Sequence, residues 1–116
     1  MSKITIYHNP RCSKSRQTLQ LLRDEGIEPT IVEYLKDPPD EKTLDSILTS
    51  LGIEPIDLIR RKEQPFKDLG LSDKTDDRDA LIKAMVAHPV LIERPIVLKG
   101  KKAAVGRPPE KVLDIL

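Results

Sequence analysis

The chain of 116 residues predicts an α/β fold in which helices pack against a four-stranded mixed sheet. Three observations support this prediction. A strand, helix and strand pattern opens the chain, a helical block fills its middle, and a strand, turn, strand and helix pattern closes it. A chain of this length suits one hydrophobic core. We therefore predict a single domain over residues 1–116.

The first block begins with a strand at residues 3–7, where polar and apolar residues alternate. A proline then interrupts the pattern. The helix that follows can be capped by Ser13 or Ser15, and Gly26 stands where a glycine commonly ends a helix. Residues 30–34 read as the second strand. A connection that contains a helix predicts that the two strands pair in parallel.

The middle block is essentially helical from residue 40 to residue 88. Asp40 begins a helix with apolar residues at helical spacing, Pro55 opens a short helix, and residues 75–77 offer caps for a third. Residues 65–70 read as irregular or briefly helical. No flexible linker flanks the block, so we interpret it as a helical insertion, at about 40–88, between the second and third strands.

The last block reads as a hairpin followed by a helix. Residues 95–98 and 103–105 have strand character, and Gly100 lies in the tight turn that joins them. Pro109 opens a final helix with apolar residues on one face. Because hairpin strands are antiparallel, adding them to the parallel pair makes the predicted sheet mixed.

Composition excludes several classes of function. Lys and Arg number 20 against 19 Asp and Glu, so no excess of positive charge favours nucleic acid or an anionic membrane. No apolar run approaches the roughly 18 residues of a membrane span, and the N-terminus lacks the apolar core of a signal peptide. We expect a cytoplasmic protein.

The single cysteine, Cys12, lies where the first strand turns into the first helix. Free N–H groups and the dipole at a helix start favour an anion, and Arg11, Lys14 and Arg16 are close in sequence. A thiol in such surroundings ionises more readily than a free one. This favours a reactive thiol over an inert buried one. One cysteine and two separated histidines do not suit a zinc site, so no metal is expected.

Three separated motifs carry a resemblance to a known family. They are Y-H-N-P-x-C-x-x-S-R at residues 7–16, E-R-P-I-V at 93–97 and G-R-P-P at 106–109. Together they resemble the glutaredoxin-coupled arsenate reductases, which have a thioredoxin-like fold. The resemblance implies Cys12 as nucleophile, His8 beside the thiolate and Ser15 in support, and it implies three arginines that bind the oxyanion: Arg60, Arg94 and Arg107. Arg61 is an alternative to Arg60.

The resemblance also implies an activity in arsenic detoxification. The Cys12 thiolate would attack arsenate, glutathione would join the adduct as co-substrate, arsenite would leave, and glutaredoxin would reduce the remaining mixed disulfide. An external thiol is needed because a disulfide requires two thiols and the chain has one cysteine. No bound cofactor is implied. The thioredoxin-like fold further implies a cis bond between Arg94 and Pro95.

Two other functions stay open on the same fold. One is a non-catalytic regulatory adaptor whose helical block binds another protein. The family includes such a branch, which binds RNA polymerase and often carries a Cys-x-x-Cys pair, but Ser15 occupies the second cysteine position here. The other is a glutathione-linked thiol exchanger that acts on another substrate.

Overall fold

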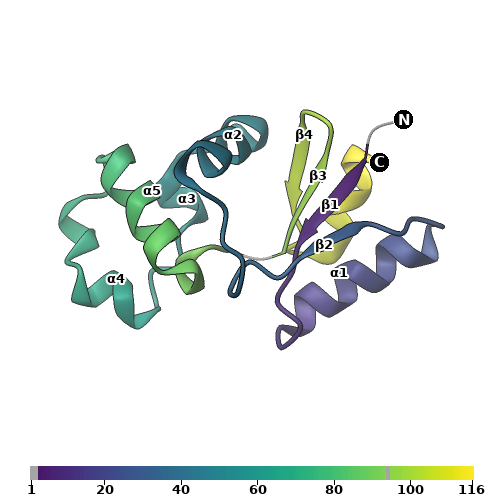
Figure 1. Ribbon diagram of the computed structural model, residues 1–116, viewed down its shortest axis with the longest axis horizontal. Helices are drawn as coiled ribbons and strands as arrows, with labels where there is room; N and C mark the ends of the chain where they lie inside the picture. The colour runs from purple at the N-terminus through teal and green to yellow at the C-terminus, as the bar shows by residue number, and fades with distance from the viewer. Residues whose placement is uncertain (1–2, 94) are drawn as a thin grey trace. The chain divides into compact units, whose positions relative to one another are not determined.

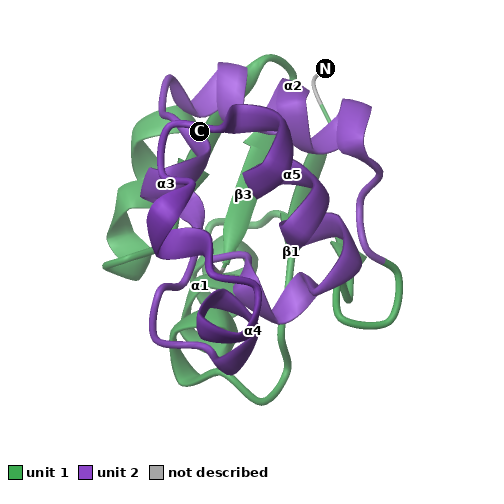
Figure 2. Cartoon of the chain, turned by 90° about the vertical axis from the view of Figure 1, so that its left-hand side faces the viewer, with its two compact units in different colours: residues 1–37, 94–116 green, residues 38–93 purple. Residues whose placement is uncertain are grey.

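The computed structural model describes residues 3–93 and 95–116. These residues form two compact units, coloured separately in Figure 2. Unit 1 comprises residues 1–37 and 94–116, and unit 2 comprises residues 38–93. Unit 1 contains the sheet, and unit 2 contains the predicted helical insertion (Figure 1). No helix among the described residues has the length and apolar character needed to cross a membrane.

Unit 1 is built on a mixed four-stranded sheet with the order β2-β1-β3-β4. The strands are β1 (Ile4–Tyr7), β2 (Thr30–Val32), β3 (Ile96–Lys99) and β4 (Lys102–Val105). β1 pairs in parallel with β2 and antiparallel with β3, and β3 pairs antiparallel with β4. The predicted parallel pair and the predicted hairpin are therefore confirmed.

Two helices complete unit 1, α1 (Ser13–Asp24) and the 3-10 helix η3 (Pro109–Ile115). Both contribute side chains to the same hydrophobic core as the central strands. The buried members of this core are Ile6, Leu19, Leu22, Val97, Val112 and Ile115. The first helix is thus held against the sheet, which fixes where its N-terminal end lies relative to β1.

Two local expectations for unit 1 were wrong. Neither Ser13 nor Ser15 caps α1, because Cys12 itself occupies the N-cap position. The second strand stops at Val32 and does not reach residue 34. The chain turns there instead. The carbonyl of Glu33 accepts hydrogen bonds from the N–H groups of Lys36 (2.9 Å) and Asp37 (3.0 Å).

Unit 2 is helical, as expected. Its longer helices are α2 (Glu41–Leu51) and α5 (Arg78–Ala87), and between them lie α3 (Pro55–Leu58), α4 (Gln64–Asp68) and the 3-10 helix η1 (Leu71–Asp73). A further 3-10 helix, η2 (Pro89–Leu91), follows α5. The fully buried large side chains of this unit are Leu44, Leu48, Leu58, Leu81, Met85, Leu91 and Ile92.

The predicted caps of unit 2 are confirmed. The Asp40 carboxylate accepts the N–H of Thr43 at 2.7 Å, and the Asp77 carboxylate accepts the N–H of Ala80 at 3.1 Å. The short helix α3 ends at Leu58, before the arginine pair that follows it. The next residue, Ile59, makes an antiparallel bridge with Ile92. This bridge joins the segment after α3 to the segment after η2.

Candidate active site

Cys12 is held at the first turn of α1 by backbone hydrogen bonds on both sides. Its N–H donates to the carbonyl of Asn9 at 3.0 Å, and its carbonyl accepts the N–H of Arg16 at 3.0 Å. The residue is extended, with φ −92° and ψ 123°, and is 9% exposed. The thiol therefore sits at a helix start, where free N–H groups favour an anion.

The turn before Cys12 is fastened to α1 through the hydroxyl of Ser15. This hydroxyl accepts the N–H of Asn9 at 3.0 Å and lies 2.6 Å from Nδ1 of His8. The Asn9 side-chain oxygen also accepts the N–H of Arg11 at 3.0 Å. Ser15 is fully buried. A buried hydroxyl with these partners fixes the turn, because leaving any of the three polar groups unpaired is costly.

The pKa of His8 lies below its ordinary value of 6.5. Burial is the main cause, since it penalises the charged imidazole. The carboxylate of Glu33 acts in the opposite sense, and the positive charges of Arg23 and Arg16 lower the pKa further. At neutral pH His8 is therefore mainly an uncharged imidazole. One hydrogen bond joins its Nδ1 to the Ser15 hydroxyl.

This lowered pKa predicts a loss of stability in mild acid. Below pH 6.5 the unfolded chain binds a proton at His8 before the folded chain does, so the free energy of unfolding falls with pH until the folded imidazole also titrates. Chemical denaturation at pH 7.5, 6.5 and 5.5 should show a smaller loss in His8→Gln than in the unaltered protein. An equal loss in both proteins would contradict this assignment.

Arg107 reaches the thiol from the far end of the sequence. Its Nη2 lies 3.7 Å from Sγ of Cys12. The residue follows β4 directly after Gly106, and its own N–H donates to the carbonyl of Val105 at 2.9 Å. The next bond, to Pro108, is cis. A guanidinium beside the sulfur places a positive charge there, and the planar fork of a guanidinium suits the binding of an oxyanion.

Gly106 permits this approach because it has no side chain. A Cβ atom at this position would lie 2.5 Å from Oγ1 of Thr18 and 2.8 Å from Cγ of Pro95. The N–H of Gly106 also donates to the carbonyl of Pro95 at 2.9 Å. The end of β4 thus packs directly against α1, which brings the following arginine toward Cys12. The importance of Gly106 and Thr18 was not recognised from the sequence.

Arg60 belongs to unit 2, where two glutamates engage its side chain. Its Nη1 lies 2.9 Å from the carboxylate of Glu63, and its Nε lies 3.9 Å from that of Glu93. Arg61 is exposed. The oxyanion role of either arginine stays a prediction. Arg94 lies outside the described residues, and so does its predicted cis bond to the next proline.

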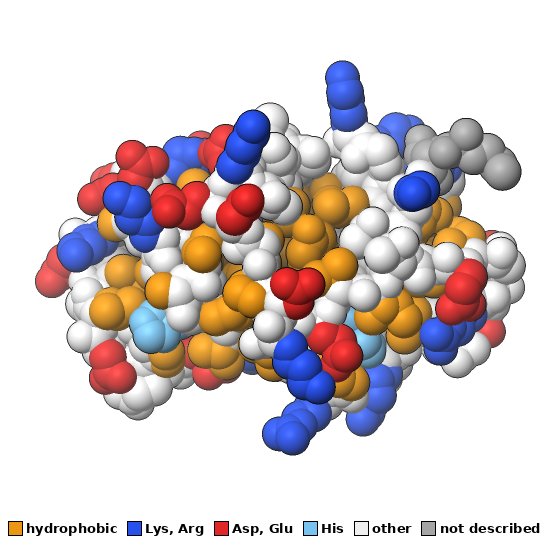
Figure 3. Space-filling view, in the orientation of Figure 1, with side chains coloured by type: hydrophobic (Ala, Val, Ile, Leu, Met, Phe, Trp, Pro, Cys, Tyr) orange, Lys and Arg blue, Asp and Glu red, His pale blue; other side chains and the backbone are white. Residues whose placement is uncertain are grey.

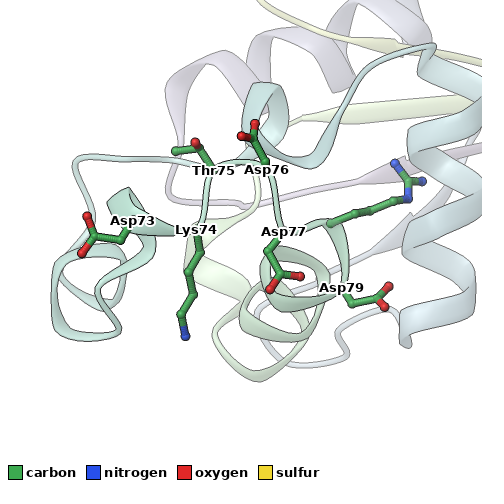
Figure 4. Close-up of a pocket in the computed structure, with 7 residues that line it drawn as sticks. Asp73, Lys74, Thr75, Asp76, Asp77 and Asp79 are labelled. Carbon is green, nitrogen blue, oxygen red and sulfur yellow. The ribbon is translucent and has the colours of Figure 1, made fainter.

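An acidic loop in unit 2 precedes α5. Residues 73–79 surround a depression of about 700 Å³. Figure 4 shows Asp73 and Asp76 pointing away from Asp77 and Asp79. Within the described part of the chain, no group of three or more His, Cys, Asp or Glu is arranged to hold a metal ion. Asp77 is the cap of α5, so this loop serves as a helix start.

The surface agrees with the balanced composition. Figure 3 shows basic and acidic side chains interspersed on the visible face. The formal net charge is +1. The face drawn in Figure 3 therefore shows no continuous basic patch among the described residues. One positive charge lies directly beside the Cys12 sulfur, that of Arg107.

Comparison with known proteins identifies the family. The family model described as the ArsC family matches residues 7–115. The uncharacterized protein YfgD of Escherichia coli K12 is 51% identical over 115 residues, which cover 98% of this chain and 97% of that protein. An arsenate reductase of Neisseria meningitidis is 48% identical over 117 residues and is covered completely, as is this chain.

A solved structure confirms the fold. The structure of an arsenate reductase from Vibrio cholerae matches with a TM-score of 0.95 and 47% identity, and the match covers 99% of this chain and 98% of that one. The expected thioredoxin-like α/β architecture is therefore confirmed. With the family model matching nearly the whole sequence, this chain belongs to the ArsC family.

Proposed function

We propose that this protein reduces arsenate to arsenite, with the Cys12 thiolate as nucleophile. The observation that carries the proposal is the approach of the Arg107 guanidinium to 3.7 Å from the sulfur. A cation with several N–H donors beside a thiol at a helix start can hold a tetrahedral oxyanion against the attacking atom. Relatives named arsenate reductases, with 48% identity over the whole chain, support arsenate as the substrate.

The proposed reaction needs two sulfur atoms. The Cys12 sulfur bonds to As(V) and displaces one oxygen, which leaves as water. The thiol of glutathione then joins the adduct. Arsenite leaves as the two sulfurs bond to each other, so the two electrons that As(V) gains are those that the two sulfurs lose. Glutaredoxin then reduces the mixed disulfide on Cys12: its two thiols become a disulfide, and the Cys12 thiol and glutathione are released.

The residues around Cys12 have two tasks in this scheme. Arg107 neutralises the charge of the bound oxyanion, and the resemblance gives Arg94 and Arg60 the same task. Ser15 and His8 hold the turn that presents Cys12. No bound cofactor takes part. Glutathione and glutaredoxin as reductants fit a cytoplasmic setting, where thiols are kept reduced.

A coupled assay tests the proposal. Purified protein with arsenate, glutathione and glutaredoxin should oxidise thiols in proportion to arsenate, and turnover should stop when the external thiol is omitted. Intact-mass measurement without glutaredoxin should find one glutathione on Cys12 and none in Cys12→Ser. Repeated turnover without an added thiol would contradict the scheme. Thiol exchange that proceeds equally without arsenate would instead favour a glutathione-linked exchanger.

A further inference from the structure

A cleft of about 220 Å³ lies in unit 1 beside the turn that presents Cys12. Residues 8–11 of this turn line one part of it, and Glu33, Leu35 and Lys36, which follow β2, line the rest. The cleft exists because β2 ends early and the chain turns at Glu33. β1 and β2 are parallel neighbours, so the segments that follow both strands emerge at the same edge of the sheet.

The cleft combines charges of both signs. Arg11, Lys36 and Glu33 are exposed. Across the described residues, none of these three side chains forms an ion pair with another charged side chain. Leu35 is 44% exposed and adds an apolar wall. The site therefore offers two cations, one carboxylate and one apolar surface to a ligand.

We propose that this cleft binds the γ-glutamyl end of glutathione, an inference that rests on the proposed function. The α-carboxylate of that end would pair with Arg11 and Lys36, and its α-ammonium group would pair with Glu33. Guanidinium groups bind carboxylates through two parallel hydrogen bonds. A ligand with both charges on one carbon matches a cleft that holds both opposite charges together.

The size of the cleft agrees with one end of the tripeptide. Pockets for whole drug-sized ligands measure roughly 300–1,000 Å³, and this cleft is smaller, at about 220 Å³. The thiol-bearing middle residue of glutathione therefore stays outside it. Cys12 directly follows Arg11 in the chain, and consecutive Cα atoms are about 3.8 Å apart. Cys12 does not itself line the cleft, so the thiol-bearing residue of glutathione would extend out of the cleft toward the neighbouring Cys12.

Direct binding can be measured without any reaction. S-methylglutathione has no free thiol, so it cannot form a mixed disulfide. Titrating it into the protein should shift the NMR signals of the His8 ring, because His8 lines the cleft. Glu33→Gln and Arg11→Gln should each weaken binding about fivefold, the upper range for an exposed ion pair. The matched controls are Glu25→Gln and Lys101→Gln, two exposed charges outside the cleft, which should leave binding unchanged.

Kinetics provide a second measurement. In Glu33→Gln, KM for glutathione should rise about fivefold, while KM for arsenate stays constant. Turnover with 2-mercaptoethanol, which lacks both charged groups, should not change. Alkylation of Cys12 by iodoacetamide should also be unchanged, which separates loss of binding from a damaged thiol. The proposal would be overturned if the cleft substitutions changed neither the binding of S-methylglutathione nor KM for glutathione.

The two proposals fail in different ways. If S-methylglutathione binds at the cleft and arsenate is not reduced, the glutathione site stands and the proposed reaction is wrong. If glutathione drives arsenate reduction while the cleft substitutions change neither binding nor KM, the reaction stands and the glutathione site is wrong. If neither binding nor arsenate reduction is observed, both proposals are wrong.

Discussion

Replacing Arg107 with alanine should reduce arsenate turnover about ten- to a hundred-fold, because loss of a charge-assisted contact costs roughly 1.5–3 kcal/mol. The reason is geometric: its Nη2 is 3.7 Å from Sγ of Cys12, so an oxyanion against the sulfur also meets the guanidinium. Arg107→Lys should give an intermediate rate, since lysine restores the charge without the planar fork.

Three controls make the Arg107 result specific. Alkylation of Cys12 by iodoacetamide should fall much less than arsenate turnover in Arg107→Ala, because the helix start still favours a negative charge after the guanidinium is removed. Arg23→Ala should keep its turnover, since Arg23 forms an exposed pair with Glu28 and such pairs contribute little. Arg94→Ala should behave like Arg107→Ala, as the family resemblance implies. Full turnover in both Arg94→Ala and Arg107→Ala would rule out the proposed anion site.

Gly106→Ala should lower both stability and turnover. The new Cβ would lie 2.5 Å from Oγ1 of Thr18 and 2.8 Å from Cγ of Pro95, so α1 and the end of β4 would have to move apart. Overpacking of this kind costs about 1–3 kcal/mol of unfolding free energy. The same movement carries Arg107 away from Cys12, and a small misplacement of a substrate-positioning group can cost about a hundredfold in rate.

A double-mutant cycle tests the cause. Urea denaturation and arsenate turnover should be measured for Gly106→Ala, Thr18→Ala and the combined variant. Thr18→Ala removes the nearest clashing atoms, so the combined variant should recover part of both losses relative to Gly106→Ala alone. If the two substitutions had simply additive effects, the contact between these residues would not be what holds Arg107 in place.

The elements of the fold were largely predictable because they depend on local patterns. Alternation of residue types identified β1, and the glycine turn identified the hairpin of β3 and β4. Asp40 and the cap candidates at residues 75–77 marked helix starts. Boundaries were less predictable. The early end of β2 coincides with a turn in which the Glu33 carbonyl accepts the N–H groups of Lys36 and Asp37. Residue types that favour a strand do not indicate such a turn.

The site was predictable only in part. Cys12 stood out as the single cysteine before a helix, and the motifs pointed to Arg107. The contact between them joins residues 95 positions apart, which periodicity alone cannot reveal. The resemblance implied that Ser15 supports the site, but not how. A serine near a helix start usually caps it, whereas here the Ser15 hydroxyl bonds the preceding turn. A glycine before Arg-Pro was the available signal for close packing at Gly106.

The pairing of β1 with β3 determines the order in which the protein can mature during synthesis. β1 lies between β2 and β3, and its residue Tyr7 pairs with Ile96. At about 5–20 residues per second, roughly 5–20 s separate the synthesis of these two partners. Long-range pairing of this kind also slows folding. Throughout that interval the nascent chain carries the Cys12 thiol without Arg107, so the proposed oxyanion site can form only after residue 107 has been synthesised.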